Sequence, residues 1–306
     1  MLALTGATGF LGGQIAAEAE ASGWRVRALV RGSDRKKVPG VAELVEGDLA
    51  NQEALYRLID GADAFIHNAG LVRARNRSAF MVVNRDGTAA AAEVWRTSGK
   101  PNAPFVLISS LAANRPTISH YAESKAEAEK EAASILGGRP FAILRPPAIY
   151  GPADKATLPL FRAIGRGIVP RIGPRDACFS MVYVNDAASA ALAALDIASN
   201  LGPIFEIDDG AGGHTWDNLR AAAEAVAGRQ LRYVAVPSTL LILMGGVGSL
   251  VGRLGLSTPF LTYGKAREIL VGDWRVNPAR VLPNWKPHTS LQSGFSKTLA
   301  WYRAHY

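Results

Sequence analysis

Tyr121 and Lys125 lie four residues apart in the segment SHYAESKAEAEKE, a spacing that could support proton transfer. On a helix, residues four apart share one face, so the ammonium group of Lys125 can act on the phenol of Tyr121. A free tyrosine has a pKa of about 10, and a nearby cation stabilises the phenolate and lowers that pKa. The pair is therefore a candidate general acid/base, in which Tyr121 exchanges the proton.

Two serines lie upstream of this pair, at the end of the apolar segment LISSLAA. A hydroxyl group placed there can hydrogen-bond the oxygen of a reacting carbonyl. We assign this role to Ser110 and expect Ser109 to pack or to cap.

The segment LTGATGFLGG, residues 4–13, is rich in glycine and lies between an apolar run at 1–4 and a helical pattern at 12–22. The order strand, glycine turn, helix and then a second strand at 24–30 is typical of a dinucleotide site, because the unpaired amides and the dipole of the first helical turn favour a pyrophosphate. The alternative is a tight turn with only a structural role. The candidate cofactor contacts in this turn are Gly6, Thr8, Gly9, Phe10, Leu11 and Gly12.

Arg31 follows the second predicted strand, where a bound dinucleotide places its adenosine ribose. An acidic residue would bind a free 2′-hydroxyl there, whereas Arg31, with Ser33 and Arg35 nearby, favours a 2′-phosphate. The pattern predicts NADP(H), with NAD(H) as the alternative cofactor and a solvated basic loop as the structural alternative. Asp48, in EGDL, could accept a hydrogen bond from the adenine amino group or cap the helix that begins at NQEAL.

Strand and helix signals alternate through the first 150 residues and predict the scaffold that positions these groups. Repeated β-α units indicate an α/β fold with a doubly wound parallel (Rossmann) sheet and ligands at the carboxyl ends of its strands. We expect a dinucleotide-binding domain over 1–150, which 176–198 rejoins, and a smaller interleaved substrate-binding lobe over 151–306. The predicted strands after the first two lie within 41–49, 61–70, 104–110 and 140–151, and the predicted helices within 51–59, 79–97, 124–136, 156–167 and 214–228. The segment 179–198 is predicted to form a strand followed by a helix.

The net charge of +8 is spread along 306 residues and is not accompanied by a nucleic-acid-binding motif. Nucleic acid is therefore not expected, and a phosphorylated cofactor or an anionic membrane surface accounts for the excess. A strand signal at residue 2 leaves no secretory leader, which predicts a cytoplasmic protein, at the inner face of a membrane if it contacts lipid. Cys178 is the only cysteine, so an internal disulfide and a cysteine-built metal site are excluded, and we expect a buried thiol and no metal.

Over nearly its whole length the chain resembles the extended short-chain dehydrogenases/reductases, the NAD(P)-dependent epimerase/dehydratase family. The motifs that carry the resemblance are TGATGFLG at 5–12, GDL at 47–49, HNAG at 67–70, VNRDGT at 83–88, ISS at 108–110, YAESK at 121–125, LRPPAIYGP at 144–152 and VYVNDAA at 182–188.

This resemblance implies a role for each matching residue. Gly6, Gly9 and Gly12 would lie at the pyrophosphate, Asp48 near the adenine and Ala69 near the adenosine side. Tyr121 would be the general acid/base, Lys125 would hold the nicotinamide ribose and lower the tyrosine pKa, and Ser110 would orient the substrate oxygen. Leu49 and Pro147 complete the candidate cofactor contacts. Asn84 is expected to tie a helix to the sheet, His67 is a strand-end variant without a metal, and a homodimer through the helix of Tyr121 and its neighbour is frequent in the family.

The spacing between Ser110 and Tyr121 departs from the family pattern. Only eleven positions separate them, where extended members usually carry a long insertion. This shortens one wall of the substrate site. Within the family, the chain is most similar to the 3β-hydroxysteroid-dehydrogenase-like group and its bacterial relatives that act on lipid ketones.

Residues 233–252, YVAVPSTLLILMGGVGSLVG, carry no charge and precede Arg253, Lys265 and Arg267. Pro237 and four glycines weaken a continuous membrane span. The segment could form a buried helix pair in the small lobe, or an exposed apolar rim that makes a peripheral membrane contact. It favours an apolar substrate.

Three functions remain open from the sequence. The first is an NADP(H)-dependent oxidoreductase that interconverts a ketone and a secondary alcohol on a bulky apolar molecule such as a sterol or a sphingolipid. The second is a nucleotide-sugar epimerase or dehydratase, in which Arg162, Arg166 or Arg171 would grip a diphosphate. The third is a non-catalytic nucleotide-binding subunit of a membrane complex.

Overall fold

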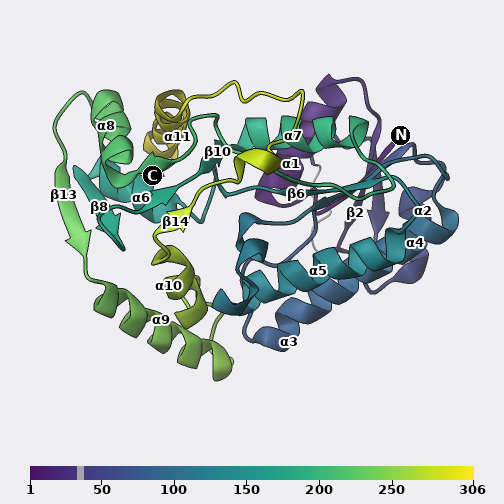
Figure 1. Ribbon diagram of the computed structural model, residues 1–306, viewed down its shortest axis with the longest axis horizontal. Helices are drawn as coiled ribbons and strands as arrows, with labels where there is room; N and C mark the ends of the chain where they lie inside the picture. The colour runs from purple at the N-terminus through teal and green to yellow at the C-terminus, as the bar shows by residue number, and fades with distance from the viewer. Residues whose placement is uncertain (33–37) are drawn as a thin grey trace.

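The structure, a computed structural model, describes residues 1–32 and 38–306. A parallel sheet of seven strands forms its centre, in the order β11-β6-β5-β4-β1-β2-β3 (Figure 1). The chain order reverses at β1, which pairs with both β2 and β4, and a doubly wound sheet binds ligands at such a point. The strands are β1 Leu2–Thr5, β2 Val26–Val30, β3 Glu43–Glu46, β4 Ala64–His67, β5 Phe105–Ile108, β6 Phe141–Arg145 and β11 Ile204–Glu206.

Helices cover both faces of this sheet (Figure 1). Leu2 and Leu4 of β1 pack toward α1 and α7, whereas Ala3 packs toward α2, α4 and α5. Both faces are thus buried, as expected for a parallel sheet with nearly continuous apolar strands. The helices are α1 Phe10–Ala21, α2 Gln52–Ile59, α3 Arg77–Phe80, α4 Gly87–Ser98, α5 His120–Leu136 and α7 Val184–Asp196, with a π-helical turn at Met81–Asp86 between α3 and α4.

The small lobe has its own core, in which Tyr150, Phe161 and Phe295 pack ring against ring. Its strands form short pairs or triplets, and its helices surround them. The strands are β7 Ala148–Tyr150, β8 Ile168–Ile172, β9 Cys178–Phe179, β10 Met181–Tyr183, β12 His214–Thr215, β13 Arg232–Val236 and β14 Asp273–Trp274. The helices are α6 Leu158–Gly165, α8 Trp216–Ala227, α9 Ser238–Arg253, α10 Tyr263–Ile269 and α11 Leu291–His305.

The two parts of the chain interleave more than the sequence indicated. The segment 140–151 holds two strands, and the second, β7, leaves the central sheet to pair with β10. Of the segment 176–198, α7 packs on the central sheet beside α1, but β10 does not join that sheet. The seventh strand is instead β11, which lies outside the expected ranges. Cys178 is partly exposed at the start of β9, not buried.

The uncharged segment forms one strand and one helix, β13 and α9, and not a buried helix pair. Within the described ranges, no helix combines the length and the hydropathy that crossing a bilayer requires. Most large side chains of α9 point away from the protein.

Candidate active site

A cavity of about 1550 Å³ opens at the carboxyl ends of β1, β2, β4 and β5 and continues into the small lobe. It brings together the two groups of residues that the sequence singled out, those for the cofactor and those for proton transfer. The predicted residues that line it are Gly6, Thr8, Gly9, Phe10, Leu11, Arg31, Asp48, Leu49, Ala69, Ser110, Tyr121, Lys125 and Pro147.

The glycine turn at one end of the cavity requires glycine at two positions. Gly6 has a φ of +74°, and a Cβ there would lie 2.8 Å from the amide nitrogen of Ala69. A Cβ on Gly12 would lie 1.9 Å from the carbonyl oxygen of Gly6, so Gly12 packs beneath the turn and does not line the cavity.

The start of α1 is suited to an anion. Its N-cap, Gly9, provides no side-chain hydrogen bond, and its first turn holds no acidic residue. The first backbone amides are therefore available to a pyrophosphate, which the helix dipole also favours. This turn fits a dinucleotide.

Two side chains line the far end of the cavity, where the adenosine would lie. Arg31 follows β2, while Ser33 and Arg35, which were expected to assist it, lie outside the described residues. The Asp48 carboxylate accepts hydrogen bonds from the amides of Ala50 and Asn51, at 2.9 and 3.1 Å. The expected alternative, Asp48 as the helix cap, is wrong, because Asn51 is the N-cap of α2.

His67, at the end of β4, has a structural role. Its ring is buried and hydrogen-bonds the hydroxyls of Thr5 and Thr88, at 2.9 and 3.2 Å. Burial lowers the pKa of His67 to about 3, with a smaller effect from the charge of Lys125. The ring is neutral at physiological pH and joins β1, β4 and α4.

Lys125 and Tyr121 occupy the same face of α5, yet their polar groups have different partners. The Lys125 ammonium donates a hydrogen bond of 2.7 Å to the carbonyl oxygen of Ile108, at the end of β5. Burial lowers the pKa of Lys125 to about 8 and raises the pKa of Tyr121 to about 12, while a hydrogen bond with Ser110 opposes the tyrosine shift. The expected lowering of the tyrosine pKa is therefore not found, because burial outweighs the favourable contacts. Tyr121 is protonated at neutral pH and can donate a proton.

The two serines have separate roles, as the sequence suggested. Ser109 donates a hydrogen bond to Glu129 of α5, whose carboxylate is paired with buried Arg145 of β6. Ser110 lines the cavity beside Tyr121, and its hydroxyl accepts a hydrogen bond of 3.2 Å from the amide of Ala112. The buried ion pair thus fixes the strand end that presents Ser110.

Asn84, in the π-helical turn, ties neighbouring elements together. Its side-chain oxygen accepts from the amide of Leu71 at 2.6 Å, and its side-chain nitrogen donates to the carbonyl of Leu71 and the hydroxyl of Ser124. It links the loop after β4 to the helix of Tyr121.

The contribution of α10 to this site was not predicted from the sequence. Glu268 is buried, hydrogen-bonds Ser119 at the start of α5, and accepts from Lys265 at 2.7 Å. The Lys265 nitrogen lies 5.9 Å from the ring centre of Tyr121, and the charge of Glu268 raises the pKa of that tyrosine. About 140 residues separate α10 from Tyr121, so no local spacing could reveal the contact.

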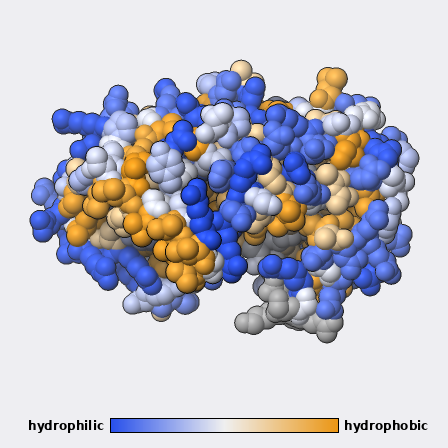
Figure 2. Space-filling model, turned by 90° about the horizontal axis from the view of Figure 1, so that it is seen from below, coloured by the Kyte–Doolittle hydropathy of each residue, from blue (hydrophilic) through white to orange (hydrophobic). Residues whose placement is uncertain are grey.

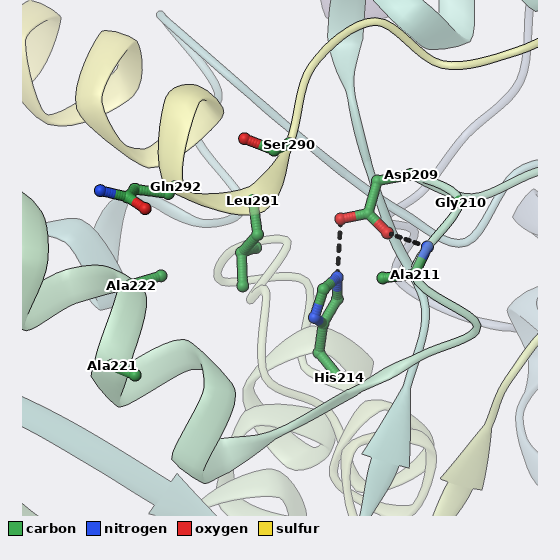
Figure 3. Close-up of a pocket in the computed structure, with 9 residues that line it drawn as sticks. All are labelled: Asp209, Gly210, Ala211, His214, Ala221, Ala222, Ser290, Leu291 and Gln292. Carbon is green, nitrogen blue, oxygen red and sulfur yellow. Dashed lines mark hydrogen bonds and ion pairs between the residues drawn. The ribbon is translucent and has the colours of Figure 1, made fainter.

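A second, smaller cavity of about 480 Å³ lies in the small lobe (Figure 3). There His214 and Asp209 form a pair at 2.6 Å. The nearby Ser290 hydroxyl points away from the imidazole and accepts from the amide of Ser293 at the start of α11. Since no serine faces the imidazole among these lining residues, the arrangement is a structural link and not a catalytic triad.

Three comparisons with known proteins agree with this geometry. The model of the "NAD dependent epimerase/dehydratase family" matches residues 2–207. The chain is 38% identical over 310 residues to a protein of Caulobacter vibrioides named "Ceramide reductase", with 99% of this chain and 95% of that protein covered. It is 30% identical over 222 residues to the "2-alkyl-3-oxoalkanoate reductase" of Shewanella oneidensis, with 63% of this chain and 57% of that protein covered.

A solved structure shares the fold across the whole chain. This is the UDP-glucuronic acid 4-epimerase of Bacillus cereus in complex with UDP-glucuronic acid and NAD, at a TM-score of 0.74 and 16% identity, with 100% of this chain and 99% of that chain covered.

Proposed function

This chain belongs to the NAD dependent epimerase/dehydratase family and is an NAD(P)-dependent enzyme of the extended short-chain dehydrogenase/reductase type. From that premise, we propose that it reduces a ketone on a ceramide-like lipid to a secondary alcohol, with NADPH as the cofactor. The relative that aligns with nearly all of the chain bears the name of a ceramide reductase, which supports a long-chain amphiphilic substrate.

One observation carries the proposal, namely the predominantly apolar lining of the cavity beyond Tyr121, where the polar side chains of the small lobe are Asp154, Thr157, Ser180, Lys265 and Glu268. A long acyl chain needs such a lining, whereas a sugar needs polar partners. The apolar side chains that the small lobe contributes are Ala156, Pro159, Leu160, Ala163, Pro170, Ile172, Ala177, Phe179, Met181, Trp216, Leu219, Phe260, Ile269, Val271 and Trp274.

The arginines that a sugar nucleotide would need lie elsewhere. Arg162, Arg166 and Arg171 do not line the cavity. The guanidinium of Arg162 lies 4.7 Å from the ring centre of Tyr306, and that of Arg171 donates to the carbonyl of Gly173. The geometry thus gives no support to diphosphate binding by these residues, and the epimerase alternative is disfavoured.

The residues around Tyr121 have separate roles in the proposed reaction. A bound nicotinamide dinucleotide supplies the hydride that the carbonyl carbon gains. Ser110 hydrogen-bonds the ketone oxygen, and Tyr121 donates the proton that this oxygen takes up. We assign to Lys125, which is fixed to β5 through Ile108, the role of holding the nicotinamide ribose, and to the glycine turn that of holding the pyrophosphate. Arg31 supports NADP(H) as the cofactor.

The decisive experiment compares two substrate classes with the purified enzyme. A ketone analogue of ceramide, presented in mixed micelles with NADPH carrying deuterium at C4 of the nicotinamide, should give an alcohol with deuterium on the carbinol carbon. UDP-glucose and UDP-glucuronic acid should remain unchanged. Epimerisation of either sugar nucleotide, without turnover of the lipid ketone, would contradict the proposal.

A further inference from the structure

The helix α9 has its side chains arranged opposite to those of an ordinary surface helix. Gly245 and Gly248 face the protein, and a Cβ on either would lie within 2.7 Å of the carbonyl oxygen of Thr262 or Leu261. These glycines let the segment before α10 pack closely. Leu241 is buried, but most of the large apolar residues point outward, whereas a helix in a water-soluble surface normally buries them.

The outward residues form one continuous apolar face, which Figure 2 shows gathered over α9. Their spacing of three and four residues places them on one side of the helix. This α9 face consists of Leu240, Leu243, Met244, Val247, Leu250 and Leu254, which are between 48% and 68% exposed, and the adjoining Leu256, which is 73% exposed. An apolar patch of this kind marks a contact site.

The charges around the α9 face indicate what covers it. From residue 225 to residue 267 the sequence holds no aspartate or glutamate. The exposed basic residues on α9 and on α10, which packs against it, are Arg253 and Arg267, and the exposed Arg75 of the neighbouring loop lies against Gly252. The Lys265 ammonium is paired with Glu268 at the large cavity. A two-fold dimer through this face would set the same cations against one another, whereas an anionic lipid surface would complement them.

From this combination of an outward apolar face and exposed arginines beside it, we propose that α9 docks the protein onto the surface of an anionic phospholipid bilayer. The apolar side chains enter the boundary between headgroups and acyl chains, and the basic residues meet the headgroups.

The same surface continues to the active site. The helix α10 packs against α9, and Phe260, Lys265 and Glu268, in and just before α10, line the large cavity. The guanidinium of Arg73 lies 4.5 Å from the ring centre of Phe260. Docking would thus place the cavity wall formed by α10 next to the bilayer, so that an amphiphile could pass from lipid to Tyr121. Only this passage of an amphiphile to Tyr121 rests on the proposed function; the docking does not.

Vesicle sedimentation tests the docking itself. The full-length protein, loaded with NADPH, is mixed with phosphatidylcholine vesicles with or without phosphatidylglycerol. We expect binding to the anionic vesicles only, and weaker binding at high salt. Replacing Leu243 and Val247 together by serine should weaken that binding at least about tenfold, because both side chains are exposed and their burial in lipid is lost. Arg253→Gln with Arg267→Gln should also weaken it.

The matched control is Leu201→Ser, which removes a side chain that is 93% exposed outside the α9 face and should leave binding unchanged. Thermal melting and NADPH binding should be the same in all variants, since none alters a buried residue. Equal binding to neutral vesicles, or unchanged binding after the double serine substitution, would overturn the proposal. A dimer in sedimentation velocity that this substitution dissociates would also overturn it, in favour of a second copy.

A separate readout keeps the docking distinct from the reaction. The double serine variant should lose turnover of the ketone embedded in vesicles yet retain turnover of a water-soluble short-chain ketone. If neither ketone is reduced by the unaltered enzyme while vesicle binding is found, the proposed reaction fails and the docking stands. If both ketones are reduced without vesicle binding, the docking fails and the reaction stands.

Discussion

The Lys125 ammonium is anchored to the carbonyl oxygen of Ile108 by a buried hydrogen bond of 2.7 Å. This bond joins the first half of α5 to the end of β5. Ile108 lies two residues before Ser110 in the sequence. The spacing between the acid, Tyr121, and the hydroxyl that orients the substrate is therefore set by the packing of a helix on a strand, and not by the intervening loop.

The first prediction concerns Tyr121. Tyr121→Phe should keep the fold and cofactor binding but lower the rate at least about a hundredfold, because the proton donor is removed. Single-turnover kinetics and cofactor titration measure the two effects. The control Tyr56→Phe, at a half-exposed position of α2, should retain full activity. Near-normal turnover by Tyr121→Phe would rule out its role as the acid.

The second prediction concerns the pH dependence that α10 imposes. The Glu268 carboxylate raises the pKa of Tyr121, so neutralising it in Glu268→Gln should lower that pKa. Reduction needs the protonated tyrosine, so the basic limb of the profile of kcat/KM should move to lower pH. Glu53→Gln, at an exposed position of α2, is the control that should leave the profile in place. An unchanged or upward-shifted limb in Glu268→Gln would contradict the coupling.

The third prediction concerns the cofactor. We expect tighter binding of NADPH than of NADH, and Arg31→Asp should reverse this order by repelling the 2′-phosphate and accepting from the free hydroxyl. Fluorescence titration with each cofactor measures both affinities. Arg303→Asp, an equal change of charge at an exposed position of α11, should alter the two affinities to a similar small extent. Equal or stronger binding of NADH by the unaltered protein would contradict the assignment of NADP(H) as the cofactor.

The fourth prediction concerns acid stability. The pKa of His67 is about 3 in the folded state and about 6.5 when the chain is unfolded, so the unfolded chain takes up this proton first as the pH falls. The free energy of unfolding should therefore decrease below about pH 6.5, by up to about 1.4 kcal/mol per pH unit from this group.

His67→Gln, which keeps a polar side chain between Thr5 and Thr88 but does not titrate, should show a shallower decrease. Urea denaturation at a series of pH values between 7 and 5 gives the comparison. Parallel curves for the two proteins would show that folding does not lower the pKa of His67.

Local sequence patterns predicted the nucleotide-binding half well. The prediction used short-range features only, namely the glycines at 6 and 12, the period of the apolar strands and the spacing of Tyr121 and Lys125. The turn, strand and helix geometry that these features indicate is also local. The fold class and the family were confirmed on this basis. The predicted membrane contact at 233–252 and a homodimer through α4 and α5 stay predictions.

Features that depend on contacts between distant segments could not be predicted from the sequence. The three-residue strand β11 pairs with β6 across some 60 residues, and Glu268 reaches Tyr121 from far along the chain. The burial that raises the tyrosine pKa is likewise a property of the assembled cavity. The direction in which α9 faces depended on where its glycines pack, and this put Leu241 on the buried side and Leu243 on the exposed one.

Both β11 and α7 lie after residue 150, so they are synthesised after the other strands of the central sheet, and this order has a consequence during synthesis. One face of the central sheet is covered partly by α7, and the edge of β6 is paired only once Ile204–Glu206 is present. A nascent chain of 150 residues on the ribosome would thus expose both an apolar face and an unpaired strand edge, which are hallmarks of a chaperone client. Completion of the sheet must await emergence of Glu206 from the exit tunnel, so ribosomal pausing before that point should increase aggregation.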